Sequence, residues 1–110
     1  MNIILYVEDN ASYREDFTAL LQDRQYVVIT SFEGQTIDTV EKAKKFLVAV
    51  NKPNAHTFGL VMPNLIVLDN ELGINPEGGN VLTKFIRQKL NLTLPVIILT
   101  NYDEQSYQDN

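Results

Sequence analysis

The segment Leu65-Ile66-Val67-Leu68-Asp69 is a run of aliphatic residues that ends in a carboxylate. Its length and β-branched content are typical of a strand that is buried on both faces, as in a parallel sheet. Similar apolar runs occupy residues 2–7, 26–30 and 94–100. We therefore predict that these segments form four strands of one sheet.

Amphipathic helices separate the predicted strands. Ser12 and Glu15 have the spacing of a capping box and predict the start of the first helix. Residues 36–50 and 81–90 carry apolar side chains at helical spacing and predict two more helices. The intervening stretches that contain proline and glycine predict loops at residues 51–64 and 70–80. Because strands alternate with helices, we predict a doubly wound α/β fold with helices on both faces of a parallel sheet.

Composition limits the possible functions. The chain has 110 residues, which is a typical size for one domain with one hydrophobic core. It contains no cysteine, which excludes disulfides, zinc–thiolate sites and thiol catalysis. Its net charge is −5 and its Lys and Arg residues form no dense block, so direct nucleic-acid binding is not expected. No apolar run could span a bilayer and no signal peptide precedes the first strand, so we expect a cytoplasmic protein without membrane contact.

The carboxyl ends of the predicted strands are where an α/β sheet of this kind binds ligands. The polar residues at or just after those ends are Glu8, Asp9, Asp69, Glu71 and Thr100. Carboxylates packed within a few ångström of one another repel, so such a cluster is stable only if a cation lies in it. The high density of hard oxygen ligands suits Mg²⁺, which we expect to bind at this edge.

Four segments of the chain, in this order, resemble the motifs of response-regulator receiver domains. They are the acidic opening Ile4–Asn10, the strand Leu65–Asp69, the helix opening Gly78–Arg87 and the strand Pro95–Thr100. The resemblance covers residues 1–110 as one receiver domain and implies a flavodoxin-like, doubly wound parallel sheet with strand order 2-1-3-4. Compared with the family, this chain lacks a fifth strand and a last helix, and residues 51–64 look like an insertion.

The resemblance also implies a role for each residue at the acidic edge. Asp69 would accept a phosphoryl group from a sensor histidine kinase or a histidine phosphotransfer protein and form an aspartyl phosphate. Glu8 and Asp9 would hold Mg²⁺ together with the Asp69 carboxylate and the backbone carbonyl of Glu71. Thr100 would be the switch hydroxyl that contacts the phosphoryl group and alters a partner-binding face. The protein would be a signalling phosphoacceptor and not an enzyme, apart from catalysing the transfer to its own aspartate.

One departure from the family leaves other functions open. The receiver resemblance implies a lysine after a fifth strand, whereas no Lys or Arg follows Lys89 in this sequence. The main alternative is therefore a pseudo-receiver, a protein-interaction module with the same fold and no phosphorylation. A metal-dependent phosphatase with Asp69 as nucleophile, or a nuclease-like Mg²⁺ site, could use the same carboxylates. Both are less favoured, because the phosphatase would need a later lysine and the nuclease a basic groove.

The strand at residues 94–100 is the last one predicted and has no predicted neighbour on one side. It is apolar on both faces and contains no lysine or central proline that would protect an exposed edge. We therefore expect self-association through this strand, by edge pairing or by exchange of elements between chains.

Overall fold

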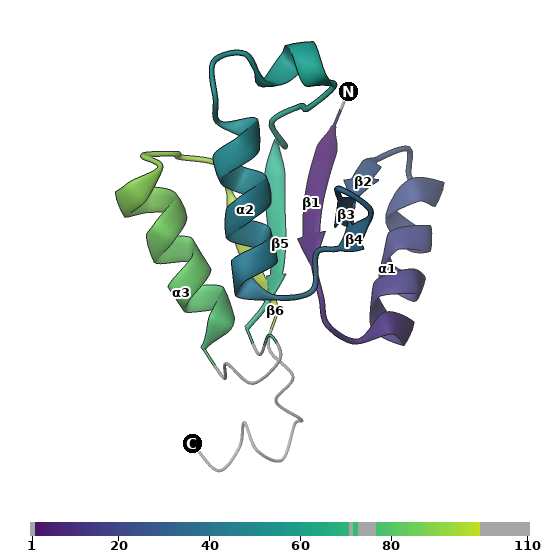
Figure 1. Cartoon of the computed structure of the whole chain (residues 1–110). Coiled ribbons are helices and arrows are strands. Elements are labelled where there is room, and N and C mark those ends of the chain that lie inside the picture. The colour runs from purple at the N-terminus through teal and green to yellow at the C-terminus, as the bar shows by residue number, and fades with distance from the viewer. Residues whose placement is uncertain (1, 71, 73–76, 100–110) are drawn as a thin grey trace.

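A computed structural model of the chain describes residues 2–70, 72 and 77–99. Its centre is a parallel sheet of four strands in the order β2-β1-β5-β6 (Figure 1). The strands are β1 (Ile3–Val7), β2 (Val27–Ile29), β5 (Leu65–Asp69) and β6 (Val96–Leu99). The predicted parallel sheet and its strand order are confirmed.

Helices cover both faces of this sheet, as the alternation of strands and helices predicted. They are α1 (Ala11–Asp23), α2 (Val40–Val50) and α3 (Gly78–Lys84), the last continued by the π-helical turn η2 (Phe85–Lys89). α1 lies on one face, whereas α2 and α3 lie on the other (Figure 1). No helix in the described part of the chain is long and apolar enough to cross a membrane.

The two faces carry hydrophobic cores of different size. Successive side chains of a strand point to opposite faces, so β1 contributes Leu5 to the core under α2 and Tyr6 to the core under α1. Within the described residues, the core under α2 and α3 contains thirteen buried residues. The core under α1 contains three, and partly buried residues such as Phe17 complete it. The α1 face is therefore the more open one.

A hairpin precedes α2 that the sequence analysis did not predict. β3 (Ser31–Phe32) and β4 (Gln35–Thr36) pair in antiparallel orientation across Glu33 and Gly34. These two turn residues have φ values of 52° and 76°, the geometry of a type I′ turn that glycine adopts without strain. The helix predicted over residues 36–50 therefore begins only at Val40.

Other predicted boundaries move by a few residues. β2 is shorter than the predicted segment 26–30, and β6 starts two residues after the predicted start at residue 94. α3 begins at Gly78, inside the segment that was predicted as a loop over residues 70–80. These shifts leave the order of the elements unchanged.

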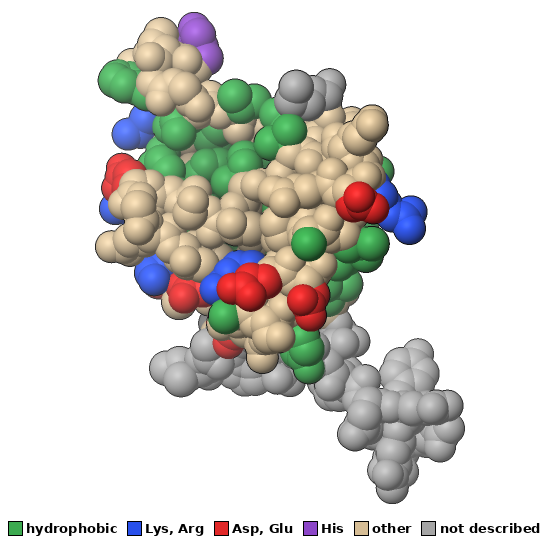
Figure 2. Space-filling model, turned by 90° about the vertical axis from the view of Figure 1, so that its right-hand side faces the viewer, with side chains coloured by type: hydrophobic (Ala, Val, Ile, Leu, Met, Phe, Trp, Pro, Cys, Tyr) green, Lys and Arg blue, Asp and Glu red, His purple; other side chains and the backbone are tan. Residues whose placement is uncertain are grey.

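The predicted loop at residues 51–64 contains a short 3₁₀ helix, η1 (Ala55–Phe58). Ala55 is buried, whereas the Phe58 side chain is 74% exposed. The chain then returns to the sheet, where Leu60 packs against the larger core. Beside it lies a hollow of about 380 Å³ lined mostly by apolar residues of β2, Phe32, Phe46 and residues 59–61. Figure 2 shows hydrophobic side chains gathered below the projection that carries His56.

Candidate functional site

The carboxyl ends of β1 and β5 bring three carboxylates together. The two strands are neighbours, with Val7 opposite Leu68, so the residues that follow β1 lie beside the end of β5. One oxygen from each of Glu8, Asp9 and Asp69 lies within 4.8 Å of the other two. Glu8 and Asp69 are buried and Asp9 is exposed. The predicted convergence of these three carboxylates is confirmed, while their chemical roles remain predictions.

The other two predicted site residues, Glu71 and Thr100, lie outside the described residues. The described chain on either side of the site is nevertheless well paired, because the Asn70 N–H donates to the Leu99 carbonyl at 2.9 Å. β6 therefore remains alongside β5 at the level of the carboxylates. The roles predicted for Glu71 and Thr100 stay predictions.

The environment of Glu8 favours its neutral form. Burial, as the largest cause, raises the pKa of Glu8 from 4.5 to about 7. A hydrogen bond with the Asp69 carboxylate and the charge of Asp69 act in the same direction, whereas the Asn10 N–H, which donates to Glu8 Oε2 at 3.3 Å, lowers the pKa. Without a cation, a large fraction of the Glu8 carboxyl group is therefore protonated at neutral pH, because its pKa is about 7.

Tyr6 belongs to this site although the sequence analysis did not single it out. Its side chain is fully buried, forms a hydrogen bond with the Glu8 carboxyl group and packs edge-on against Phe17, with ring centroids 5.0 Å apart. Burial, followed by the charges of Glu8 and Asp69, raises the pKa of Tyr6 to about 12. Its hydroxyl therefore stays protonated. The available signal was its position two residues before Glu8, which puts both side chains on one face of the sheet.

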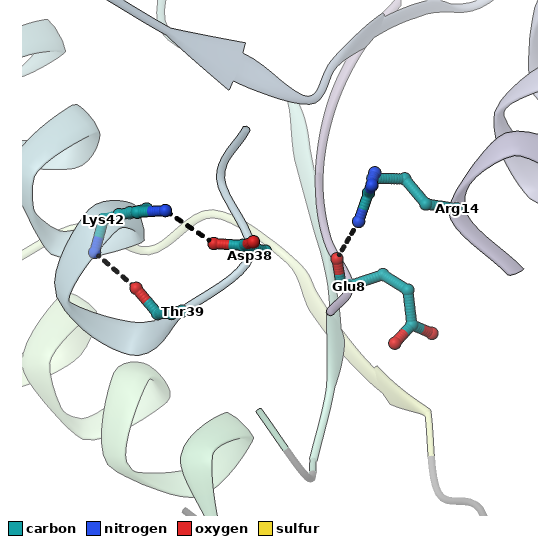
Figure 3. Close-up of polar contacts among 5 residues, drawn as sticks. All are labelled: Glu8, Arg14, Asp38, Thr39 and Lys42. Carbon is teal, nitrogen blue, oxygen red and sulfur yellow. Dashed lines mark hydrogen bonds and ion pairs between the residues drawn. The ribbon is translucent and has the colours of Figure 1, made fainter. Parts of the chain in front are cut away.

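The first turn of α1 holds the backbone of the acidic pair. Arg14 Nη1 donates to the backbone carbonyl of Glu8 at 2.8 Å (Figure 3). Figure 3 shows that the Glu8 carboxylate extends away from this guanidinium group. Arg14 thus anchors the main chain that presents the carboxylates.

The cap of α1 differs from the predicted one. Asn10 is the N-cap residue, and its Oδ1 accepts a hydrogen bond from the Tyr13 N–H at 2.9 Å. Ser12 lies inside the first turn, so the predicted capping box of Ser12 and Glu15 is wrong. Asn10 therefore both starts the helix and contacts the Glu8 carboxylate.

The start of α2 lies at the same end of the sheet and carries its own polar contacts. Lys42 Nζ forms an ion pair with Asp38 Oδ1 at 3.0 Å, and the Lys42 N–H donates to Thr39 Oγ1 at 3.1 Å (Figure 3). Thr39 thereby caps the helix. This lysine is engaged within its own helix turn.

Gly78 and Gly79 allow α3 to approach the segment that follows β5. A Cβ atom on Gly79 would lie 3.0 Å from Asn70 Cα and 3.2 Å from Ile98 Cγ2. A Cβ atom on Gly78 would lie 3.0 Å from Leu72 Cβ. Both distances to the chain after β5 are tighter than ordinary packing, so the two glycines are required for close contact next to Asp69.

The three carboxylates fit a magnesium ion. Mg²⁺ binds oxygen at about 2.1 Å in octahedral geometry, so its neighbouring ligands lie about 3–4 Å apart. The span of 4.8 Å among the Glu8, Asp9 and Asp69 oxygens is close to that range. A cation would replace the proton on Glu8 as the compensation for two buried carboxyl groups. The chemistry of these ligands therefore agrees with the predicted metal.

Comparison with solved structures identifies the fold. The non-phosphorylated HemR receiver domain from Leptospira biflexa matches with a TM-score of 0.63 and 25% identity, over 99% of this chain and 73% of that chain. The MaeR response regulator bound to beryllium trifluoride matches with a TM-score of 0.62 and 23% identity, over 99% of this chain and 75% of that chain. A fusion protein with a trimeric coiled coil of yeast Spc42 matches with a TM-score of 0.67 and 26% identity over 98% of this chain.

This chain spans 59% of the length of that fusion protein. Protein-family models and curated protein sequences give no match. The match to the two receiver structures extends over almost the whole chain and agrees with the strand order and the flanking helices. The chain therefore has the fold of a response-regulator receiver domain.

Proposed function

We propose that this chain accepts a phosphoryl group on Asp69 in a Mg²⁺-dependent reaction of two-component signal transduction. The observation that supports this proposal is the cluster of Glu8, Asp9 and Asp69 oxygens within 4.8 Å, at the carboxyl ends of adjacent strands in a receiver fold. Each of these residues occupies the position at which such a sheet presents its ligands.

Mg²⁺ would be held by the carboxylates of Glu8, Asp9 and Asp69, with the backbone carbonyl of Glu71 as a further ligand. When bound, the ion supplies positive charge that offsets the negative charge on the phosphoryl oxygens. Arg14 supports this arrangement indirectly, because it fixes the backbone of Glu8.

Asp69 would act as the nucleophile. One of its carboxylate oxygens attacks the phosphorus atom of a phosphohistidine, and the bond between phosphorus and the imidazole nitrogen breaks. The electron pair of that bond leaves with the imidazole of the donor, and Asp69 becomes an acyl phosphate. Tyr6 and the Asn10 N–H both contact the Glu8 carboxyl group and keep it beside Asp69. Thr100 would donate its hydroxyl to a phosphoryl oxygen and transmit the change to a partner-binding face.

The donor would be a sensor histidine kinase or a histidine phosphotransfer protein in the cytoplasm. The domain would turn over only its own phosphoryl group and would not act on a separate substrate. Its output would be altered binding of a partner, because a new charge at a two-state site changes the surface around it.

Intact-mass spectrometry after incubation with acetyl phosphate and Mg²⁺ tests this proposal. We expect the mass of one labile phosphoryl group that hydroxylamine removes, as it does from an acyl phosphate, and this mass should disappear in Asp69→Asn and when Mg²⁺ is chelated. Asp23→Asn, at an exposed carboxylate at the end of α1, is the matched control and should be labelled like the parent. Labelling that persists in Asp69→Asn would contradict the assignment.

A second function is a pseudo-receiver that binds partners without phosphorylation. The cluster of Glu8, Asp9 and Asp69 would bind Mg²⁺ in either case, so phosphorylation of Asp69 is what distinguishes the two functions. If Mg²⁺ binds while acetyl phosphate leaves the mass unchanged, the pseudo-receiver is the better description.

A further inference from the structure

The connection between α2 and β5 borders an apolar surface at the end of the sheet where the strands begin. About two to six residues usually connect a helix to a strand in an α/β unit, whereas this connection covers residues 51–64. It contains η1 and lies at the opposite end of the sheet from the candidate site (Figure 1). Connections of this length in a compact domain usually have a function of their own.

Hydrogen bonds fix η1 in place. Gly59 has a φ of 76° and ends η1 in the left-handed conformation. Its N–H donates to the His56 carbonyl at 3.1 Å, and the Leu60 N–H donates to the Ala55 carbonyl at 3.2 Å, which is the pattern of a Schellman motif. The Phe58 side chain is held beside this turn with 74% of its surface exposed. So exposed a ring contributes little to the stability of the chain itself.

Two adjoining hollows lie beside η1 and share Phe32 and Leu60 as walls. The first, of about 370 Å³, is bordered by Phe58 and Lys52. The second, of about 380 Å³, is lined mostly by apolar residues of β1, β2 and the connection. Phe32 packs edge-on against Phe46, with ring centroids 5.4 Å apart, so this shared wall is fixed as well. Each hollow reaches the lower end of the range of about 300–1,000 Å³ that is usual for ligand sites.

Lys52 gives this apolar surface a positive border. The chain has a net charge of −5, yet it contains four lysines and no Asp or Glu between Glu41 and Asp69. The three lysines of α2 each form an ion pair with a nearby carboxylate, at 3.0–3.7 Å. Lys52 is exposed and forms no ion pair with any residue that the structure describes. Figure 2 shows hydrophobic side chains gathered below the projection that carries His56, with a basic side chain at their border.

We propose that the two hollows beside η1 bind an acidic peptide segment of a partner protein. Its apolar side chains would pack against Phe32, Phe58 and Leu60, and one of its carboxylates would form an ion pair with Lys52. The charge favours an acidic partner over a second copy of this chain, because a two-fold interface would bring the Lys52 side chains of both copies into one patch. The inference is independent of phosphorylation at Asp69, at the other end of the sheet.

An NMR titration of the isotope-labelled protein with two short peptides tests this proposal. The peptides acetyl-Asp-Phe-Leu-amide and acetyl-Asn-Phe-Leu-amide differ in a single carboxylate. At millimolar concentration, we expect both to produce saturable shifts of the amides of Phe32, Lys52 and Leu60. The acidic peptide should bind about two- to fivefold more tightly, which is the contribution of one exposed ion pair. Added salt should remove this preference, because it screens an exposed pair.

Two variants with matched controls locate the contacts. Lys52→Gln should bind both peptides equally, whereas Lys84→Gln, at an exposed lysine of α3, should keep the preference for the acidic one. Phe58→Ala should weaken both peptides by about threefold or more, because it removes apolar contact area. Val81→Ala, at a side chain on α3 that is 39% exposed, should bind both like the parent. Labelling of Asp69 by acetyl phosphate should be the same in Lys52→Gln and the parent, which separates this inference from the proposed function.

Several results would overturn the proposal. The amides of Phe32 and Leu60 could stay unmoved, or the parent could bind the two peptides equally at low salt. Shifts confined to Leu20 and Leu99 would place the peptides in the groove between α1 and β6 instead. Shifts of Phe32 and Leu60 that appear when the protein alone is concentrated would mean that a second copy occupies the hollows.

Discussion

The two faces of the sheet differ in how completely they are packed, and the candidate site belongs to the more open one. α2 alone contributes five buried residues to the face that it shares with α3. α1 contributes none, and the hydrophobic core on its face holds three buried residues, all from β1 and β5, within the described chain. Glu8 follows Ile4 and Tyr6 at two-residue spacing, and Asp69 follows Val67, so both carboxylates lie on the α1 face.

This difference in packing indicates that one face of the sheet supplies most of the stability, whereas the other holds the candidate site. Buried apolar area is the main source of stability, so the free energy of unfolding is concentrated under α2 and α3. The α1 face can hold buried carboxylates and an open groove because less of the core depends on it. Changes of charge or occupancy there should disturb the rest of the fold little.

The largest expected effect is on the free energy of unfolding, when one leucine on each face of the sheet is replaced by alanine. Leu47 on α2 is fully buried, whereas the Leu20 side chain on α1 is 48% exposed. Leu47→Ala should lower the free energy of unfolding by about 2–5 kcal/mol, because it leaves a cavity in a packed core. Leu20→Ala should lower it by less than about 1 kcal/mol. Urea denaturation followed by circular dichroism measures both values.

Equal losses in the two variants would break the comparison. They would mean that α1 is packed as tightly in solution as α2, and that the groove lined by Phe17, Leu20 and Leu99 is closed. A loss near zero for Leu20→Ala would strengthen the contrast between the two faces, since the side chain of Leu20 would then contribute almost nothing to the free energy of unfolding.

A smaller effect is expected from the buried carboxylate pair. The pKa of Glu8 is about 7 in the folded chain and ordinarily 4.5, so the folded state binds more protons between these values. The free energy of unfolding of the metal-free parent should therefore fall as the pH rises from about 4.5 to 7. Glu8→Gln should reduce this fall and should be more stable than the parent at pH values above 7 in the presence of EDTA.

Thermal unfolding of the two proteins over a pH series measures this difference. Glu15→Gln, at an exposed carboxylate on α1, is the matched control and should follow the parent at each pH. If the parent and Glu8→Gln show the same pH dependence, burial does not raise the pKa of Glu8 in the folded protein. Mg²⁺ should stabilise the parent more than Glu8→Gln, because the ion takes the place of the proton.

The sheet and the convergence of the carboxylates could be predicted because both depend on residue order. Apolar runs such as Leu65–Asp69 mark buried strands, and neighbouring parallel strands bring the residues after them together. The strand order followed from the receiver resemblance, because periodicity alone does not specify which strands are neighbours.

The contacts that hold the carboxylates could not be predicted in this way. Asn10 and Ser12 are both good caps, and only the backbone path shows that Asn10 accepts the Tyr13 N–H. In the sequence, Tyr6 is indistinguishable from an apolar strand residue, because its hydrogen bond with Glu8 depends on the folded positions of both side chains. The hairpin at residues 31–36 was missed because its strands are two residues long and show no alternation.

The most direct test of the account is a titration of the metal-free protein with Mg²⁺, followed by NMR. We predict saturable shifts of the amides of Glu8, Asp9 and Asp69 at millimolar Mg²⁺, and amides in α2 near Leu47 that do not move. Asp9→Asn should require several-fold more Mg²⁺ to produce the same shifts. If these amides stay unmoved, or if Asp9→Asn titrates like the parent, the acidic cluster on the open face is not a metal site.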